Sequence, residues 1–415
     1  MALKILMLCV KNPWPPKDGG AIAMLNMIRG FHKAGHKVTV VAVNTPKHYV
    51  FLRNIPDDIQ RLAEYYTIEI DTSVKWRDVM ANLMFSKESY HVQRFRSKNF
   101  RWQLERILEA REFDVIQIET LFMGAYIDSI RAKAPKALVA LRAHNIEHEI
   151  WDRRAKNEEN PIKQYVFKET AVRIKKYEQT FYKKNPYDVL VPITGRDAGI
   201  LKKLGAIKPA YVCQVGMDFD ILDTRPVELE YPSVFYIGAL DWEPNREGLD
   251  WFLKEVWPKV HPSFPQVKFF IAGRNMPNKY LSIRQDNIVV LGEVPSASEF
   301  IKSKAVMVVP IFSGSGMRVK IVEGMAYGKP IVATPMAAEG MSAKHGNNIM
   351  LAQTAEDFAD RVRILIEQRS IHDTISARAR SFVKSRFDND SITKGLLGFY
   401  EKQLAGKRKR QKDKE

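Results

Sequence analysis

Short runs of β-branched and aliphatic residues alternate with longer amphipathic segments along the whole chain. A parallel strand reaches its neighbour through a crossover that is usually a helix, so this alternation is typical of α/β layers built on parallel sheets. No internal repeat with a period of roughly 20 to 50 residues is visible, which argues against a solenoid. With 415 residues, the chain is also too long for one ordinary core. We therefore predict an α/β fold with two Rossmann-like domains.

The first predicted domain covers residues 1–222. Its predicted strands are Lys4–Val10, Lys37–Val43, Asp114–Glu119, Ala137–Arg142, Asp188–Pro192 and Ala210–Gln214. Helices are predicted between these runs at Gly20–Ala34, at Gln103–Ala110, and in a long charged segment from Glu147 to Lys183. Pro161 should interrupt or kink that last helix, because proline lacks the backbone N–H that an inner helical turn needs.

A polar, proline-containing segment from Asp223 to Ser233 is expected to lead into a second domain, residues 233–387. The predicted strands of this domain are Ser233–Gly238, Val267–Ala272, Ile288–Leu291, Val306–Pro310 and Pro330–Ala333. Its predicted helices are Arg246–Val260, Ser296–Ser303, Met317–Tyr327, Ala355–Gln368 and Ile371–Ser385. Residues 388–405 are expected to form a final helix, and the basic residues 406–415 a disordered tail.

The composition is that of a folded soluble protein, with 45% hydrophobic and 27% charged residues. The two cysteines, Cys9 and Cys213, lie in strand-like runs, which favours a reducing compartment over a disulfide framework. The apolar start Leu3–Val10 is short and lacks a small-residue cleavage site, so we interpret it as a strand and not as a signal peptide. No run approaches the roughly 20 apolar residues of a membrane-spanning helix. A cytoplasmic protein is expected.

The formal net charge of +17 favours an anionic partner, which can be a nucleic acid, an anionic membrane surface or an anionic substrate. Part of the excess lies in the C-terminal tail. That tail is equally well explained as a solubilising end without a partner.

The segment Ser313–Thr334 combines a loop of small residues, a predicted helix and a buried strand. The loop leaves backbone N–H groups available, and the start of the helix adds a positive dipole end, so an anion belongs there. The loop residues concerned are Gly314, Ser315, Gly316 and Met317.

Two cations and a carboxylate follow this loop. Arg318 and Lys320 can neutralise phosphate oxygens. On helical spacing, Gly316, Lys320 and Glu323 share one face. This arrangement suits a ligand with phosphates at one end and a hydroxyl-rich group, such as a nucleotide ribose, further along.

Several short motifs form an ordered set with this segment. They are Asp18–Ala21, Val212–Asp218, Phe235–Ala239, Phe270–Gly273 and Val290–Val294. Together they resemble the retaining family-four glycosyltransferases of GT-B fold, over most of the chain and most strongly over residues 306–334. The resemblance implies two Rossmann-like domains that face an interdomain cleft, with the C-terminal helix returning to the first domain. It also implies retaining transfer of a sugar from a nucleoside diphosphate, without a metal or another cofactor.

The resemblance assigns glycines after predicted strands to the donor site. Gly19 and Gly20 would lie near the donor's phosphate and sugar, unless they are only a turn pair. Gly238, Gly273 and Val294 are assigned to the same site.

Glu323 matches the second glutamate of the family's Glu-x7-Glu motif, which binds the ribose; a solvated helix carboxylate is the alternative. The first glutamate of that motif is replaced by Ser315, which leaves the donor sugar open. An arginine that many relatives carry is replaced by Ala239. In the family, a lysine follows this arginine along the chain. Arg246 is expected to take the role of that lysine, or to be only a surface charge. Arg318 and Lys320 would then neutralise the departing diphosphate.

His144 follows a predicted strand, and the resemblance places it beside the donor sugar as a catalytic group. Arg142 is a candidate phosphate or acceptor contact. A structural histidine is one alternative. Another alternative is a metal site of His144 and His148 with Glu147 or Glu149. The order of these residues matches no zinc-protease motif, and no third ligand is apparent.

Residues Ser73–Leu108 interleave aromatic and basic side chains. The aromatic ones are Trp76, Phe85, Tyr90, Phe95, Phe100 and Trp102, and the basic ones are Lys75, Arg77, Lys87, Arg94, Arg96, Lys98 and Arg101. The pattern suits a membrane interface or an anionic lipid-linked acceptor, and equally single-stranded nucleic acid. Core aromatics flanked by solvated charges are the alternative. By resemblance, the first predicted domain would hold the acceptor and the second, residues 233–387, the nucleotide-sugar donor. The segment lies in the first domain, which favours a lipid or glycan over nucleic acid.

We therefore expect a hexosyltransferase-type enzyme that moves a sugar from a nucleotide-sugar donor to a hydroxyl of a glycan or lipid-linked acceptor. By resemblance, it would serve polysaccharide biosynthesis and could be peripheral at the inner face of the cytoplasmic membrane. A sugar-nucleotide epimerase of the same fold is one alternative. A non-enzymatic basic module that binds membrane or nucleic acid is the other.

Overall fold

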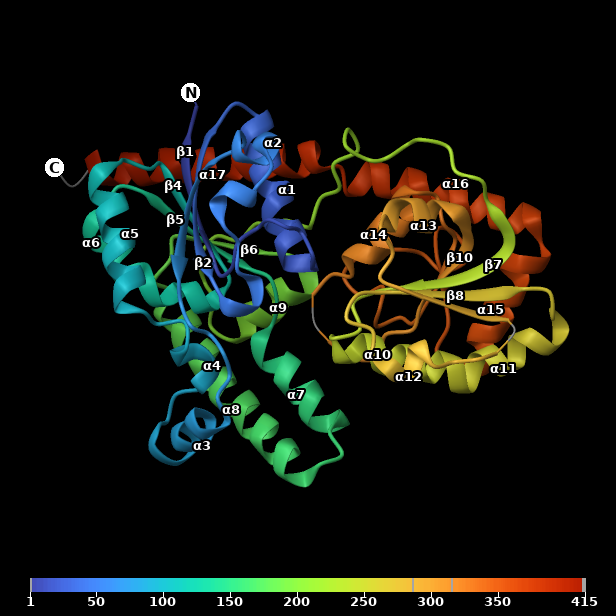
Figure 1. The fold of residues 1–415 in the computed structure, drawn as a ribbon. Helices are drawn as coiled ribbons and strands as arrows, with labels where there is room; N and C mark the ends of the chain where they lie inside the picture. Colours follow the sequence, from blue (N-terminus) through green and yellow to red (C-terminus); the bar gives the residue numbers. More distant parts are fainter. Residues whose placement is uncertain (1, 286, 315, 413–415) are drawn as a thin grey trace. The chain divides into compact units, whose positions relative to one another are not determined.

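The computed structural model describes residues 2–285, 287–314 and 316–412, and the chain forms two compact units. Unit 1 comprises Met1–Gly216 together with Asn389–Glu415, and unit 2 comprises Met217–Asp388. Each unit is built on a parallel sheet with helices on both faces (Figure 1). The α/β class predicted from the sequence is confirmed.

In unit 1 the sheet consists of β1 Lys4–Cys9, β2 Lys37–Asn44, β3 Glu64–Glu69, β4 Val115–Glu119, β5 Leu138–Ala143 and β6 Val189–Pro192. Its helices are α1 Gly19–Lys33, α2 Asp57–Gln60, α3 Trp76–Phe85, α4 Tyr90–Gln93, α5 Lys98–Ala110, α6 Ile127–Lys133, α7 Glu147–Asn157, α8 Pro161–Lys184, α9 Gly195–Lys203 and α17 Asn389–Lys412.

In unit 2 the strands are β7 Glu230–Ile237, β8 Lys268–Ala272, β9 Ile288–Gly292, β10 Lys304–Val309, β11 Ile331–Ala333 and β12 Met350–Leu351. The helices are α10 Glu243–Trp251, α11 Trp257–Val260, α12 Asn278–Leu281, α13 Ala297–Ser303, α14 Val319–Ala326, α15 Ala355–Glu367 and α16 Arg369–Arg386. A π-helical turn, Phe252–Val256, joins α10 to α11.

Both sheets have the doubly wound strand order. It is β3-β2-β1-β4-β5-β6 in unit 1 and β12-β11-β10-β7-β8-β9 in unit 2. The order reverses between β1 and β4 in the first sheet and between β7 and β10 in the second. In open sheets of this kind, ligands bind beyond the carboxyl ends of the strands at the reversal point.

Alternate residues of each central strand enter different cores. In β1, Leu6 and Leu8 pack with α5 and α6, while Ile5 and Met7 pack with α1 and α17. The two-residue period of a strand thus explains why the whole run Lys4–Cys9 is apolar after its first residue.

The long helix expected from Glu147 to Lys183 is two helices. α7 ends at Asn157, and α8 begins at Pro161, where the Asn160 side chain accepts hydrogen bonds from the next free backbone amides. The predicted interruption at Pro161 is therefore confirmed.

The prediction of a strand at Ala210–Gln214 is wrong. This segment runs beside β6, with the amides of Tyr211 and Cys213 donating to the carbonyls of Leu190 and Pro192. Pro192 has no N–H to donate in return, so pairing reduces to one isolated bridge between Leu190 and Ala210. The sequence prediction also missed the edge strands β3 and β12.

The predicted disorder of residues 406–415 is wrong for its described part, because α17 continues to Lys412. Lys407 donates to the Ala137 carbonyl at 2.6 Å and pairs with Asp188 at 3.1 Å, and Arg408 pairs with Asp114 at 2.9 Å. These acidic residues, at the starts of β4 and β6, offset the repulsion within the basic run. Residues 413–415 lie outside the described residues.

Within the described part of the chain, no helix combines the length and the hydropathy needed to cross a bilayer.

Candidate functional site

In unit 2, the predicted motifs meet where the strand order reverses. The loop after β7 leads to α10, and the loop after β10 leads to α14. A Cβ atom placed on Gly238, in the first loop, would lie 3.2 Å from Nζ of Lys320, in α14. A Cβ atom on Gly314, in the second loop, would lie 2.9 Å from the Trp242 ring in the first. The two loops are therefore in contact.

The ammonium group of Lys320 is the centre of this cluster. Its Nζ donates to Asn245 Oδ1 at 2.9 Å and to the Ile237 carbonyl at 3.4 Å, and it lies 4.7 Å from the centre of the Tyr236 ring. Burial and, to a smaller extent, the charge of Arg318 lower the pKa of Lys320 to about 7. None of the three contacts carries a full negative charge, so an anion bound here would favour the protonated amine.

Arg318 closes the loop that precedes α14. Its guanidinium donates to the Gly316 carbonyl at 2.8 Å and to the Ser313 carbonyl at 3.1 Å, and it lies 5.3 Å from the centre of the Trp242 ring. These contacts fix the loop conformation. Neutralisation of phosphate by Arg318 stays a prediction.

The helix after this loop begins later than predicted. Gly314 and Gly316 have φ values of +97° and +79°, and Arg318 caps α14 with non-helical angles, so the helix starts at Val319. The prediction that Gly316 shares a helical face with Lys320 and Glu323 is therefore wrong. Positive φ explains why glycine occupies both loop positions. Ser315 lies outside the described residues.

Glu323 lies three residues beyond Lys320 on α14 and is half-buried. Burial raises the pKa of its carboxyl group. Among the described residues, no donor lies within hydrogen-bonding distance of this carboxylate. A partly desolvated carboxylate without a donor is unfavourable, so the group suits a site that a ligand's hydroxyl groups complete.

Gly238 and Gly273 follow the neighbouring strands β7 and β8. A Cβ atom on Gly273 would lie 2.0 Å from the carbonyl oxygen of Gly238. Neither position can carry a larger residue without displacing backbone or the Lys320 side chain. The structure thus explains both glycines by close packing, and contacts from them to a donor remain predictions.

Three other predicted donor contacts have local roles. Arg246 Nη1 donates to the Leu240 carbonyl at 3.0 Å and braces the loop after β7. Val294 and Met317 are partly buried against the core between the sheet and α13, α14 and α16. Their contacts with a ligand also remain predictions.

Sequence reasoning missed Asn245, which connects the two loops. Its amide nitrogen donates to the Ala239 carbonyl at 2.8 Å, while its oxygen accepts from Lys320. The hydroxyl of Tyr236 donates to the Asn245 carbonyl at 3.2 Å. A sequence signal was present, because Asn245 follows Pro244, which suits the first turn of a helix, shortly after Gly238.

In unit 1, Gly19 and Gly20 open α1, after the loop that follows β1. The Asp18 side chain accepts from the amides of Gly20 and Ala21, each at 3.0 Å, and pairs with Lys11 at 2.6 Å. Although burial opposes the shift, the charge and hydrogen bond of Lys11 lower the pKa of Asp18. A bound anion would compete with Asp18 for these amides, and the donor contacts of both glycines stay predictions.

His144 lies directly after β5, beside the end of β4. Its Nε2 is hydrogen-bonded to Glu119 Oε2. Arg142 is fully buried and donates to the Ala23 carbonyl at 3.2 Å and to Glu119 at 3.5 Å. Arg142 therefore belongs to the interior of unit 1, and its interpretation as a ligand contact is wrong. Glu119 is a partner that the sequence analysis missed.

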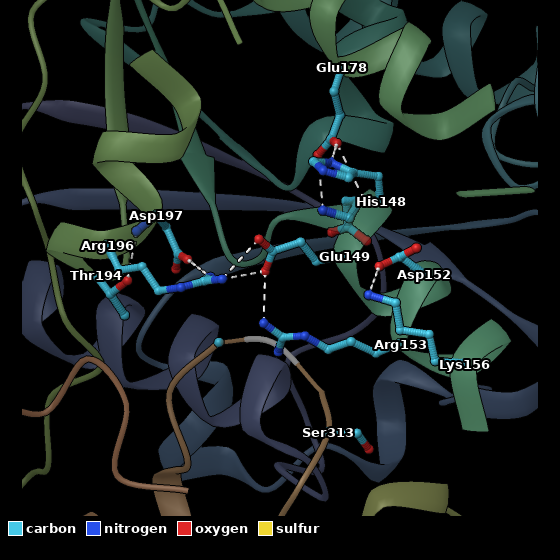
Figure 2. Close-up of polar contacts among 12 residues, drawn as sticks. His148, Glu149, Asp152, Arg153, Lys156, Glu178, Thr194, Arg196, Asp197 and Ser313 are labelled. Atoms are coloured by element: carbon cyan, nitrogen blue, oxygen red, sulfur yellow. Dashed lines mark hydrogen bonds and ion pairs between the residues drawn. The ribbon is translucent and has the colours of Figure 1, made fainter. Parts of the chain in front are cut away.

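His148 and Glu149 of α7 have structural partners (Figure 2). His148 Nδ1 is hydrogen-bonded to Glu178, whose carboxylate also accepts from the Glu147 amide at 2.9 Å. Glu149 pairs with Arg153 at 3.0 Å and with Arg196 at 2.7 Å. Among the described residues, no group of three or more His, Cys, Asp or Glu side chains is arranged to hold a metal ion.

Glu147 is buried beside Glu178. Burial and the charge of Glu178 raise the pKa of Glu147 to about 8. The Glu178 carboxylate thus caps the first turn of α7, while the carboxyl group of Glu147 beside it is mostly protonated at neutral pH.

The sequence is similar to those of known glycosyltransferases. Residues 231–368 match the profile of the family described as Glycosyl transferases group 1. The chain is 22% identical over 412 residues to an uncharacterised 44.6 kDa protein of the cps region of Klebsiella pneumoniae, which covers 95% of this chain and 99% of that one. It is 26% identical over 197 residues to the phosphatidyl-myo-inositol mannosyltransferase of Mycobacterium leprae, covering 45% of this chain and 52% of that one.

Among solved structures, HepE of Anabaena in complex with UDP-glucose aligns with a TM-score of 0.65 at 14% identity, covering 96% of this chain and 100% of that chain. This likeness, together with the two doubly wound sheets, confirms the predicted GT-B fold.

Proposed function

We propose that the chain, a glycosyltransferase whose residues 231–368 match the glycosyl transferases group 1 family, transfers a sugar from a nucleoside-diphosphate sugar to a hydroxyl of a glycan or lipid-linked acceptor. One observation carries the donor class. Lys320 and Glu323 lie three residues apart on α14, where the strand order of unit 2 reverses. Among the described residues, no negatively charged group contacts the Lys320 ammonium, and no donor reaches the Glu323 carboxylate. A diphosphate linked to a ribose offers a charge for the first and hydroxyl groups for the second.

In the proposed reaction, the bond between the anomeric carbon and the diphosphate oxygen breaks, a bond to the acceptor oxygen forms, and the proton of the acceptor hydroxyl passes to the departing diphosphate. The leaving diphosphate gains negative charge, which Lys320 would stabilise without a metal ion. Gly314 and Gly316 would let the loop backbone approach the phosphates closely. Retention of the anomeric configuration is proposed from the motif resemblance described above.

The names of relatives support the acceptor class. One relative is encoded in a cps region, and another is a mannosyltransferase that acts on phosphatidyl-myo-inositol by its name. We therefore propose polysaccharide or glycolipid assembly at the inner face of the cytoplasmic membrane. HepE has been solved with UDP-glucose, which makes UDP-sugars the first donors to test.

The test is a donor panel with product analysis. The purified chain is incubated with UDP-, GDP- and ADP-sugars, with and without lipid and glycan acceptors. We expect one donor to raise the melting temperature and to release nucleoside diphosphate faster when an acceptor is present. Conversion of a donor into a different sugar nucleotide without any acceptor would contradict transfer and indicate an epimerase.

The membrane proposal rests on α3, which projects from the body of unit 1 beside α8 (Figure 1). Its Trp76, Met84 and Phe85 are 52%, 66% and 85% exposed. Exposed cations lie on or next to the helix, namely Lys75, Arg77 and Lys87. Apolar side chains flanked by cations suit the interface of an anionic bilayer.

The other aromatic side chains of Ser73–Leu108 differ in their exposure. Phe95 and Phe100 are core residues, as the alternative interpretation of the sequence had it, and Trp102 lies exposed on α5. Arg173 of α8 donates to the carbonyls of Leu83 and Ser86 at the end of α3 and holds the helix in place.

Vesicle co-sedimentation tests this surface. Wild-type protein should bind phosphatidylcholine vesicles that contain phosphatidylglycerol, and bind less as salt rises. The double variant Met84→Gln/Phe85→Gln should bind about tenfold more weakly, because it removes apolar area from the contact. Trp102→Gln is the matched control and should bind like wild type. Equal binding of the double variant and the wild type would exclude α3 as the contact.

A further inference from the structure

A chain of buried hydrogen bonds leads from the C-terminal helix to His144. The hydroxyl of Tyr400, on α17, donates to Gln117 Oε1 at 2.7 Å. The other end of that amide, Nε2, is hydrogen-bonded to Glu119 Oε1, and Glu119 Oε2 is hydrogen-bonded to His144 Nε2. Tyr400, Gln117 and Glu119 are fully buried, and His144 retains 8% exposure.

Charge sets the direction of these bonds. Burial raises the pKa of Glu119, but the charge of Arg142 and the hydrogen bond from His144 outweigh it, so the pKa is lowered and the group is a carboxylate. A carboxylate only accepts hydrogen bonds, so His144 Nε2 must carry the proton. Burial raises the pKa of Tyr400 well above its ordinary value, so this phenol is a neutral donor. Each donor in this series of hydrogen bonds, from Tyr400 to His144, thus faces an acceptor.

In its neutral form, the His144 imidazole is therefore held in the Nε2–H tautomer, with Nδ1 as an acceptor. Among the described residues, no hydrogen-bond partner is found for Nδ1. We propose that Glu119 is a positioning residue for His144, and that Tyr400, through Gln117, keeps Glu119 in place. The proposal rests on the proposed function and on the motif resemblance, which places His144 beside the donor sugar, where Nδ1 would accept a hydrogen bond from a substrate hydroxyl.

The variant Glu119→Gln makes a sharp test, because the neighbouring amide dictates its orientation. Gln117 Nε2 is already committed as a donor, since Gln117 Oε1 accepts from Tyr400. The new carbonyl therefore faces Gln117 and the new NH2 group faces His144, which removes the longer 3.5 Å contact that Arg142 makes at this position. This arrangement reverses the hydrogen bond and favours the Nδ1–H tautomer, in which Nδ1 cannot accept.

The experiment measures ¹⁵N chemical shifts of the His144 ring together with kinetics of sugar transfer. We expect the Nε2–H tautomer in wild type and the Nδ1–H tautomer in Glu119→Gln. The variant should lose about 10- to 100-fold in kcat with KM for the donor changed less than about twofold, because His144 keeps its place but no longer presents an acceptor to the substrate. Tyr400→Phe should lower kcat by a smaller factor. Tyr187→Phe, which removes another buried tyrosine hydroxyl, is the control and should leave kcat unchanged.

The Nδ1–H tautomer in wild type would overturn the proposal, and this measurement requires no variant to fold. An unchanged tautomer in Glu119→Gln would overturn it as well. If wild type transfers no sugar from any donor, the proposed function fails, and the tautomer still decides whether Glu119 orients His144.

Discussion

Replacing Lys320 by methionine should lower kcat/KM for sugar transfer by about 10²- to 10³-fold, the usual cost of removing one fixed group that stabilises transition-state charge. The expectation follows from the site. The lysine is partly desolvated, its contacts are an amide oxygen, a carbonyl and a tyrosine ring, and its pKa of about 7 shows that its charge is not balanced by the protein. A diphosphate would supply the missing negative charge. Initial rates with the preferred donor measure the effect.

Lys329→Met is the matched control for this variant. Lys329 is also buried, its Nζ donates to the Lys302 carbonyl at 2.7 Å, and burial lowers its pKa to about 8, but it follows the opposite end of α14. Loss of this lysine should leave transfer unchanged in the folded protein. Equal activity of Lys320→Met and Lys329→Met would remove Lys320 from the site.

The pKa of Lys320 also gives donor binding a pH dependence. The free lysine is charged below its pKa of about 7 and loses its charge above it, while a nucleotide sugar keeps a constant charge in this range. Affinity for the donor should therefore fall as the pH rises from about 7 to about 9, and Lys320→Met should abolish this fall.

The largest expected effect on stability comes from Gly248→Ala. Gly248 lies on the inner face of α10, and a Cβ atom there would stand 1.6 Å from the carbonyl oxygen of Pro310, the residue after β10. Backbone cannot yield as a flexible side chain does, so helix and loop must separate. We expect a loss of at least about 3 kcal/mol, or roughly 10 °C in Tm, by calorimetry or urea unfolding.

Gly199→Ala is the matched control, because it makes the same glycine-to-alanine change inside a helix without the close contact. Gly199 lies inside α9, and no heavy atom stands within 4 Å of the added Cβ. Alanine is the better helix former, so this variant should be stabilised by about 0.5 to 1 kcal/mol. If Gly248→Ala unfolded at the same temperature as wild type, the close contact between α10 and Pro310 would be contradicted.

The sequence predicted the elements whose signal is local. The run Lys4–Cys9 is apolar on both faces because it lies in the middle of a covered parallel sheet, and Gly314 and Gly316 before α14 mark a loop with positive φ. The edge strand β3 was missed because its burial alternates weakly, with Glu64 and Glu69 exposed at its two ends. In such a strand, neither the apolar run nor the turn signals stand out.

The contacts that shape the site are not local. Asn245 and Lys320 are 75 positions apart, and Glu119 and His144 are 25 positions apart. Arg142 and His144 are two positions apart on the same strand end, yet one is sealed inside unit 1 and the other keeps some exposure. Only the packing of α1 and α17 on the sheet distinguishes them, and no single-sequence pattern contains it. Trp76 and Phe100 could not be told apart for the same reason.

The proposed function depends most on where the nucleotide binds, so a crystal structure with a bound nucleoside diphosphate is the most direct measurement. We predict phosphate oxygens within hydrogen-bonding distance of Lys320 Nζ, which would release or share its bond to Asn245, and ribose hydroxyls on the Glu323 carboxylate. A nucleotide bound away from the reversal of strand order in unit 2, with Lys320 and Glu323 untouched, would contradict the account.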